Sequence, residues 1–121
     1  MTSQELKNKS KKFAIDIVRL TDELPNKSIG WNVSNQITRS STSVAANYRA
    51  VCRAKSDKDF ISKMETVIEE CDETQFWFEL IEELKIVNSL DEGKRIWKEA
   101  DELTSIFVSS VKTVKNRLNK S

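Results

Sequence analysis

The sequence predicts an all-α protein, an antiparallel four-helix bundle with up-down-up-down topology. Apolar residues recur at alternating steps of three and four along four long segments, which is the spacing of a buried helix stripe. The 121 residues include only two glycines and one proline, too few for many hairpin turns. The links between the segments are short, and short links favour antiparallel neighbours.

The first helix is expected from about Ser3 to Leu24. Thr2 and Glu5 have capping-box spacing at its start. Pro25 ends the helix because proline disfavours helical geometry in the residue before it. The buried stripe of this helix is expected to contain Leu6, Phe13, Ile17, Leu20 and Leu24.

The second helix follows a short link through Gly30 and is expected to end near Ala54. Its middle, residues 40–46, has only small side chains apart from Val44, which allows a neighbouring helix to approach closely. The apolar stripe consists of Val33, Ile37, Val44, Tyr48 and Val51.

The third helix is expected from Asp57 to about Lys85, and Ser56 and Asp59 repeat the capping-box spacing at its start. Thr74 is the only polar residue that interrupts its apolar stripe. The stripe consists of Phe60, Met64, Val67, Cys71, Phe78 and Ile81.

The fourth helix is expected to follow Asn88, a helix-ending residue, and to begin with the capping pair Ser89 and Glu92. Gly93 near its start costs about 1 kcal/mol relative to alanine. The four segments make one domain over residues 1–121, a usual size for a compact domain. The last stripe contains Ile96, Ala100, Leu103, Phe107, Val111, Val114 and Leu118.

Several chemistries are excluded by composition. The absence of histidine removes Ser-His and Cys-His catalysis and the Glu-x-x-His ligands of di-iron bundles. Two widely separated glycines cannot form a phosphate-binding loop. Cys52 and Cys71 are expected to be small buried residues and cannot supply four zinc ligands. We therefore expect no enzyme activity, no metal, no cofactor and no small-molecule substrate.

Location follows from what the sequence lacks. No segment approaches the roughly 20 apolar residues that a membrane span needs. The first residues carry no apolar signal core, so export is not expected. We expect a cytoplasmic protein without a membrane partner.

Acidic residues gather in the third helix, although the net charge of the chain is only +1. From Glu65 to Glu83 there are eight acidic residues and no basic one. Such a face is usually a solvated surface, and a hard-metal site or an acid pair is the alternative. Because like charges at helical spacing repel, we expect Arg39, Arg49 or Arg53 to relieve them, in the same chain or the next subunit. Four of these acids share one face, Glu65, Glu69, Asp72 and Glu73.

Basic residues gather around the turn between the second and third helices, at Arg49, Arg53, Lys55 and Lys58. This cluster could bind a phosphate backbone, and arginine together with the adjacent Tyr48 could stack on unpaired bases. The alternative is a balanced surface with intramolecular ion pairs. One subunit offers few phosphate contacts, whereas several copies in a ring would multiply them.

Apolar residues exceed one stripe per helix. Ile15 and Val18 lie off the stripe of the first helix, and Ile61 and Ile68 lie off that of the third. They could widen an ordinary core face, or they could form a second face between subunits. Three large rings are the candidates for such an interface, Trp31, Trp77 and Trp97.

Two stretches of the sequence resemble a known family. They are residues 36–50, with the core Arg39-Ser-x-x-Ser43-Val-x-Ala-Asn47, and residues 53–60. Further matches are Ile17-Val-Arg-Leu-Thr, Leu24-Pro25 and Glu73-Thr-Gln-Phe-Trp-Phe-Glu-Leu. The family consists of four-helix-bundle proteins encoded in 23S ribosomal RNA intervening sequences, and the resemblance covers about residues 13–84.

The resemblance implies a bacterial, cytosolic bundle that assembles as a ring, expected to be a pentamer, with no recognised catalytic centre. A related branch resembles the accessory protein of diversity-generating retroelements, which works with a reverse transcriptase and its RNA. Arg39, Ser43 and Asn47 match the family signature, together with Arg49 and Arg53. The signature could also be structural, with Asn47 or Gln36 hydrogen-bonded across the bundle to fix its register.

These observations lead to one expected function and one alternative. We expect a non-enzymatic homo-oligomer that is RNA-associated or assists assembly of a nucleoprotein. Its partners would then be copies of itself and a structured RNA. The alternative is a protein–protein interaction scaffold with no nucleic-acid role.

Overall fold

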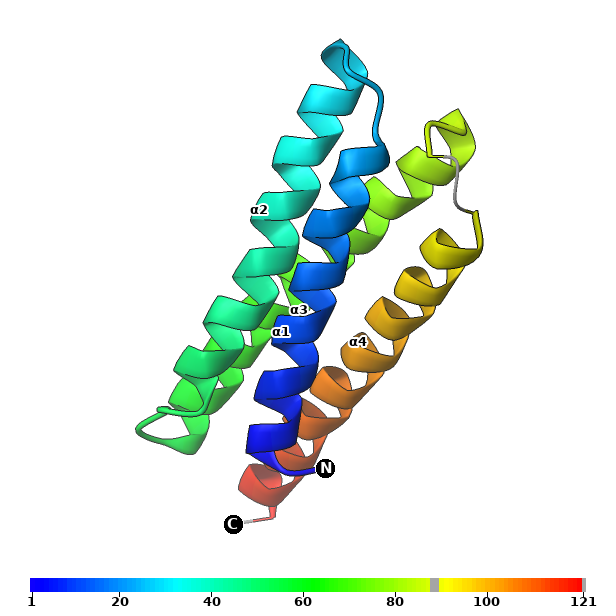
Figure 1. Cartoon of the computed structure of the whole chain (residues 1–121). Coiled ribbons are helices and arrows are strands. Elements are labelled where there is room, and N and C mark those ends of the chain that lie inside the picture. The colour runs from blue at the N-terminus through cyan, green and yellow to red at the C-terminus, as the bar shows by residue number, and fades with distance from the viewer. Residues whose placement is uncertain (88–89, 121) are drawn as a thin grey trace.

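The computed structural model describes residues 1–87 and 90–120. It contains α1 (Ser3–Leu20), the 3₁₀ helix η1 (Thr21–Glu23), α2 (Ser28–Val51), α3 (Asp57–Leu84) and α4 (Leu90–Asn119). Consecutive helices run in opposite directions, so both chain ends and the α2–α3 turn lie at the same end of the molecule (Figure 1). Packing joins α1 to α2, α2 to α3, α3 to α4 and α4 to α1. The predicted four-helix bundle is confirmed.

Side-chain caps start two of the helices as predicted. The backbone N–H of Glu5 donates to the hydroxyl of Thr2 at 3.1 Å, and that of Asp59 donates to the hydroxyl of Ser56 at 3.0 Å. Each cap supplies an acceptor for an N–H group that has no partner inside its own helix. The expected cap at Ser89 and the helix-ending Asn88 lie outside the described residues.

Two helices end earlier than expected. The helix α1 ends at Leu20, and its last turn becomes η1, because Leu24 before Pro25 is extended with φ −74° and ψ 147°. The helix α2 ends at Val51 instead of Ala54. This leaves Cys52 exposed just beyond the helix, so the expectation that Cys52 is buried is wrong.

The core combines the apolar stripes of all four helices, as the periodicity predicted. Most members of the four stripes are buried; Leu24 and Phe60 are only partly buried against the core. Leu118 is 37% exposed near the end of α4, so its expected place in the core is wrong. The largest side chains that are fully buried include Phe13, Ile17, Met64, Leu103 and Phe107.

Gly30 allows the link between α1 and α2 to be short. The N–H of Lys27 donates to the carbonyl of Pro25 at 2.9 Å, which folds the link back over the start of α2. A Cβ atom on Gly30 would lie 1.8 Å from the same carbonyl oxygen. Only glycine therefore fits at this position without a shift of the backbone.

The end of α3 is a left-handed cap at Lys85, with φ 53°. The N–H of Ile86 donates to the carbonyl of Ile81 at 3.3 Å, which is the bond of a Schellman motif that spans six residues.

No helix in the described part of the chain is both long and apolar enough to cross a membrane.

Candidate nucleic-acid and subunit interfaces

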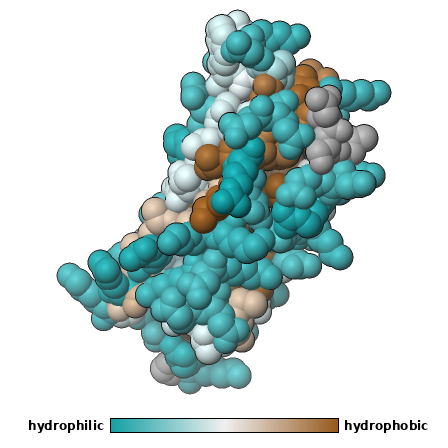
Figure 2. Space-filling model, in the orientation of Figure 1, coloured by the Kyte–Doolittle hydropathy of each residue, from teal (hydrophilic) through white to brown (hydrophobic). Residues whose placement is uncertain are grey.

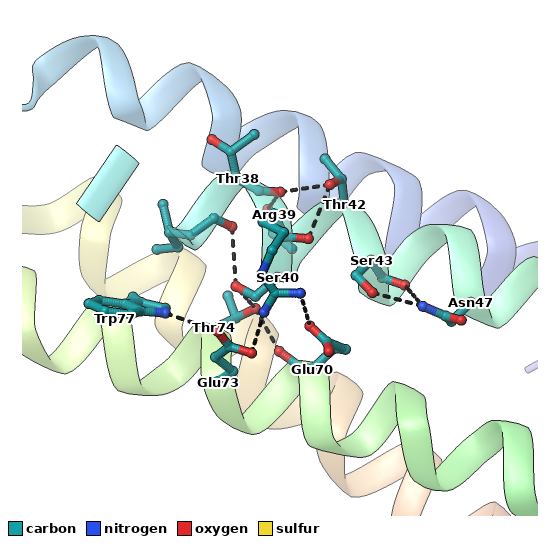
Figure 3. Close-up of polar contacts among 12 residues, drawn as sticks. Thr38, Arg39, Ser40, Thr42, Ser43, Asn47, Glu70, Glu73, Thr74 and Trp77 are labelled. Carbon is teal, nitrogen blue, oxygen red and sulfur yellow. Dashed lines mark hydrogen bonds and ion pairs between the residues drawn. The ribbon is translucent and has the colours of Figure 1, made fainter. Parts of the chain in front are cut away.

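Arg39 joins α2 to α3 through two carboxylates (Figure 3). Its guanidinium pairs with Glu70 at 3.2 Å and donates a short hydrogen bond to Glu73. The indole N–H of Trp77 donates to the other oxygen of Glu73 at 3.4 Å. The hydrogen bond from Arg39 holds the pKa of Glu73 below its ordinary value. The expectation that Arg39 relieves the acidic face of α3 is confirmed.

A buried hydroxyl pair lies directly beside this ion pair. Ser40 and Thr74 are both fully buried, and their hydroxyls are hydrogen-bonded at 2.8 Å (Figure 3). The hydroxyl of Thr74 also lies 2.8 Å from the carbonyl of Glu70. The polar interruption of the α3 stripe is therefore a satisfied contact between α2 and α3, as buried polar groups require.

The other signature residues act within α2. The side-chain amide of Asn47 donates to the carbonyl of Ser43 at 2.9 Å and to its hydroxyl at 2.7 Å (Figure 3). Gln36 is exposed and makes no cross-bundle hydrogen bond within the described ranges. The expectation that Asn47 or Gln36 bonds across the bundle is wrong, because the amide of Asn47 finds its partners one turn earlier on its own helix. In this stretch, the polar contacts from α2 to α3 among the described residues come instead from Arg39 and Ser40.

The opposite side of α2 forms an open groove with α1, which we call the α1/α2 groove. Its volume is about 710 Å³. On this face, hydrophobic residues are exposed between hydrophilic ones (Figure 2). Ile15 and Val18 are 40% and 39% exposed, although both are large apolar residues. The apolar floor of the groove consists of Ala14, Ile15, Val18, Ala45 and Ala46. Four cations also line the groove, Lys7, Lys11, Arg19 and Arg49.

Charge in the α1/α2 groove has one sign. No carboxylate lines it, and none of its four cations forms an ion pair in residues 1–87 and 90–120. The acid nearest to the middle of α1, Asp16, pairs instead with Lys12 at 3.0 Å and with Arg95 of α4 at 3.4 Å. Burial raises the pKa of Asp16, but the hydrogen bonds and charges of Lys12 and Arg95 outweigh this and lower it. Asp16 is thus neutralised by Lys12 and by α4, whereas Lys7, Lys11 and Arg19 of the same helix line the groove.

The predicted basic cluster lies at the end of the bundle that holds the α2–α3 turn. The four side chains are exposed and form no ion pair in the described part of the chain. The expected alternative, intramolecular ion pairs, therefore does not occur for any of these four side chains within the described residues. Arg49 also lines the groove, so the cluster and the groove form one basic surface.

Sequence reasoning missed three members of this basic surface, Lys7, Lys11 and Arg19. They come from the first helix, which also carries acids, so no local excess of positive charge marks them. The four-residue step from Lys7 to Lys11 was the available signal, because it places both on one helix face. Which helix that face meets depends on the packing of α1 against α2.

Tyr48 does not belong to the exposed basic surface. It is only 5% exposed, and its ring stacks on Phe107 of α4 with the centroids 5.4 Å apart. Burial raises the pKa of its hydroxyl. The expectation that Tyr48 could stack on a base is wrong, because its place on the core stripe turns the ring inward.

The three tryptophans lie apart from one another. Trp31 is 57% exposed on α2, where its indole N–H donates to the side chain of Asn26 at 2.9 Å. Trp77 and Trp97 are half-buried against the core of their own chain. No ring contact joins any two of them in the described residues. The interface role of all three stays a prediction, and Trp31 is the most accessible.

The described part of the chain has no cluster suited to a metal ion, and one of its two thiols is buried. Those residues contain no group of three histidine, cysteine or acidic side chains that could hold a metal ion. Cys71 is fully buried, and burial raises the pKa of its thiol to about 12. A thiol of this kind is not a nucleophile at neutral pH, because the thiolate is the reactive form.

Comparison with known proteins places the chain in a family. Residues 2–109 match the family model described as 23S rRNA-intervening sequence protein. The chain is also similar to a crystal structure of a protein with unknown function from the S23 ribosomal protein family of Bacteroides thetaiotaomicron. The two are 34% identical with a TM-score of 0.80, over 88% of this chain and 98% of that one. No curated protein matches the sequence. The chain belongs to the family of 23S rRNA-intervening sequence proteins.

Proposed function

We propose that the chain is a non-catalytic, homo-oligomeric protein of the bacterial cytoplasm that associates with structured RNA. The basic cluster at the α2–α3 turn carries the proposal. Its cations are exposed and form no ion pair in the described residues, so their charge is available to phosphates. Phosphate contacts of this kind supply most of the affinity in sequence-independent binding. The cluster consists of Arg49, Arg53, Lys55 and Lys58.

Assembly of several copies supports RNA binding by avidity. The net charge is only +1, so a single subunit has a weak overall attraction for RNA. Copies arranged in a ring, which we propose to be a pentamer, would place several clusters on one RNA. Trp31, Ile15 and Val18 are exposed apolar residues of the kind that subunit contacts cover.

RNA binding is tested by measuring the affinity for a structured RNA at two salt concentrations. The test variant carries Arg53→Glu, Lys55→Glu and Lys58→Glu, three exposed residues of the cluster that do not line the α1/α2 groove. We expect the affinity to fall at least tenfold, and its salt dependence to become shallower by about one unit of slope for each phosphate that the variant no longer binds. The matched control carries Lys94→Glu, Lys98→Glu and Lys112→Glu, three exposed lysines of α4. Equal affinity of the wild type and the test variant would contradict the proposal.

A scaffold without an RNA role is the second candidate, favoured by the apolar floor of the α1/α2 groove. Small side chains on this floor leave room for a helix of another protein. A second protein that co-purifies with the wild type and is lost with Ile15→Lys would support the scaffold. The scaffold is excluded if no protein partner is found for the wild type and the Ile15→Lys variant binds RNA as the wild type does.

A further inference from the structure

We infer that the α1/α2 groove of one copy receives the outer face of α3 from a second copy of this chain, in a head-to-tail contact. The inference rests on the proposed oligomer and assigns its interface to two particular surfaces. Three features carry it: the opposite charges of the two surfaces, an apolar group on each, and a central part of the α3 face that is about as long as the groove.

The donor surface is a narrow exposed stripe on α3, which we call the acidic stripe. It contains a single aromatic residue, Phe76, which is 53% exposed and contacts Trp77 edge-on with the centroids 4.9 Å apart. Within the described residues, only Glu65 of its carboxylates is paired, with Lys115 at 3.3 Å. Steps of three and four residues place its members on one face, Glu65, Glu69, Asp72, Phe76, Glu79 and Glu83.

The receiving surface has the opposite charge. The α1/α2 groove presents four cations and no carboxylate, and its cations have no ion pair among the residues that the structure describes. Like charges repel along each surface taken alone. Bringing the two surfaces together pairs the carboxylates of one copy with the cations of the next. The contact therefore removes both repulsions at once.

The apolar parts of the two surfaces also match. The floor of the groove is made of small and branched residues, so a helix can come close to it. Phe76 would be covered by Ile15 and Val18, each of which is about two-fifths exposed in the single subunit. Burial of exposed apolar area favours association, whereas charge complementarity chiefly sets orientation and specificity.

Length is consistent with this pairing. At 1.5 Å per residue, the groove runs about 18 Å along α1 from Lys7 to Arg19. The part of the acidic stripe from Glu69 to Glu79 is about 15 Å long by the same rise. The unpaired carboxylates on both sides of Phe76 thus fall within the reach of the groove cations.

The contact has to come from another copy. In one subunit the helix α3 packs against α2 and α4 and makes no packing contact with α1 within the described residues. The acidic stripe points away from the core, since its members are exposed. Because the two surfaces are different patches, the contact is heterologous, and it closes into a ring if its rotation permits.

Charge reversal tests this interface, with molar mass measured by light scattering over a range of concentrations of the full chain. The groove variant carries Lys11→Glu and Arg19→Glu, and the stripe variant carries Glu69→Lys and Glu79→Lys. We expect each to weaken assembly at least tenfold in dissociation constant. All four changes in one chain are expected to restore assembly. A mixture of the two variants is expected to restore the contact between unlike copies but not a closed ring of five, because two alternating variants need an even number of positions.

Two controls accompany this test. The pair Lys94→Glu and Lys98→Glu alters charge to the same extent on α4 and is expected to leave the mass unchanged. Helicity by circular dichroism is expected to be the same in all variants, because every altered side chain is exposed. Phe76→Ala is expected to weaken assembly without any loss of helicity.

The outcomes separate this inference from the proposed function. If the wild type assembles and neither charge-reversal variant assembles more weakly, the interface is wrong and the proposed oligomer stands. A wild type that is monomeric throughout would overturn the interface and the oligomer together. If the groove variant loses RNA binding but keeps its mass, the groove belongs to RNA and the interface is wrong. Rescue by the combined reversals supports the interface.

Discussion

Helix α2 presents two different surfaces to its two neighbours. Toward α3, Arg39 is paired with Glu70 and Glu73, and the buried hydroxyls of Ser40 and Thr74 are hydrogen-bonded. Toward α1, the surface opens into a groove with an apolar floor, and its cations lack carboxylate partners in the described residues. The first side stabilises the fold of the subunit. The second side carries charge and apolar area that remain exposed in the single subunit.

The difference teaches that local composition does not decide which charges are paired. Arg39 and Arg49 lie on the same helix, in a stretch without acids. Antiparallel register places Arg39 opposite Glu73 of α3, whereas Arg49 lies on the face of α2 that lines the groove with α1, where no carboxylate is found among the lining residues. Register and helix face therefore separate an arginine that stabilises the fold from one that is available for binding.

The largest expected effect comes from two isoleucines of α1 that are two residues apart. Ile17 is fully buried, whereas Ile15 is 40% exposed in the α1/α2 groove. Ile17→Ala is expected to cost about 2–5 kcal/mol of unfolding free energy, measured by urea denaturation at low protein concentration. Ile15→Ala is expected to change it by about 0.5 kcal/mol or less and to weaken assembly instead. Equal losses from the two changes would show that the groove is not an open surface.

The next effect concerns the link that positions α1 beside α2. Gly30→Ala is expected to cost about 1–3 kcal/mol, because its Cβ would meet the carbonyl of Pro25 and the backbone would have to shift. Gly93→Ala is the matched control, since its Cβ would lie 3.8 Å from the ring of Phe78. That change is expected to stabilise α4 by up to about 1 kcal/mol. Thermal unfolding of both variants checks the difference in sign.

The buried hydroxyl pair tests the closed side of α2. Thr74→Val keeps the shape of the side chain but leaves the hydroxyl of Ser40 without this partner, at an expected cost of about 1–2 kcal/mol. Adding Ser40→Ala removes the second hydroxyl as well, and most of that loss is expected to be recovered. Urea denaturation of the two single variants and the double variant measures the coupling. Additive losses would mean that the two hydroxyls do not interact.

The smallest expected effect is on acid stability. The pKa of Glu73 is lowered by the hydrogen bond from Arg39, so its contribution to stability is complete above the ordinary value of 4.5. That contribution is expected to be lost as the pH falls through the lowered pKa that Glu73 has in the folded protein. Glu73→Gln is therefore expected to lower stability at pH 7 and to make its fall on acidification shallower. Asp101→Asn is the control, because this exposed carboxylate of α4 forms no ion pair in the described residues.

The fold could be predicted because the signals were local. The stripes and the caps at Thr2 and Ser56 depend on residues within one or two turns of one another. The pairing of Arg39 could be predicted because helices two and three are adjacent and carry opposite charge. The place of Tyr48 in the apolar stripe was predicted correctly, whereas its stacking role was wrong, because that role was inferred from basic neighbours in sequence and not from its helix face.

The α1/α2 groove could not be predicted, because two helices build it together. Lys7, Lys11 and Arg19 become neighbours of Arg49 only when α1 packs against α2. The contact between Ser40 and Thr74 was missed for the same reason. A single polar residue in an apolar stripe shows that a partner is needed and does not show which helix supplies it.

Whether another copy completes the open side of α2 is tested most directly by the molar mass of the full chain in solution. Light scattering is expected to give a fixed multiple of the 13.9 kDa subunit at micromolar concentration, with five copies for the proposed pentamer. Salt is expected to shift the equilibrium toward smaller species, because the contact pairs exposed charges. A mass of 13.9 kDa at every concentration would contradict the claim that another copy covers the open side of α2.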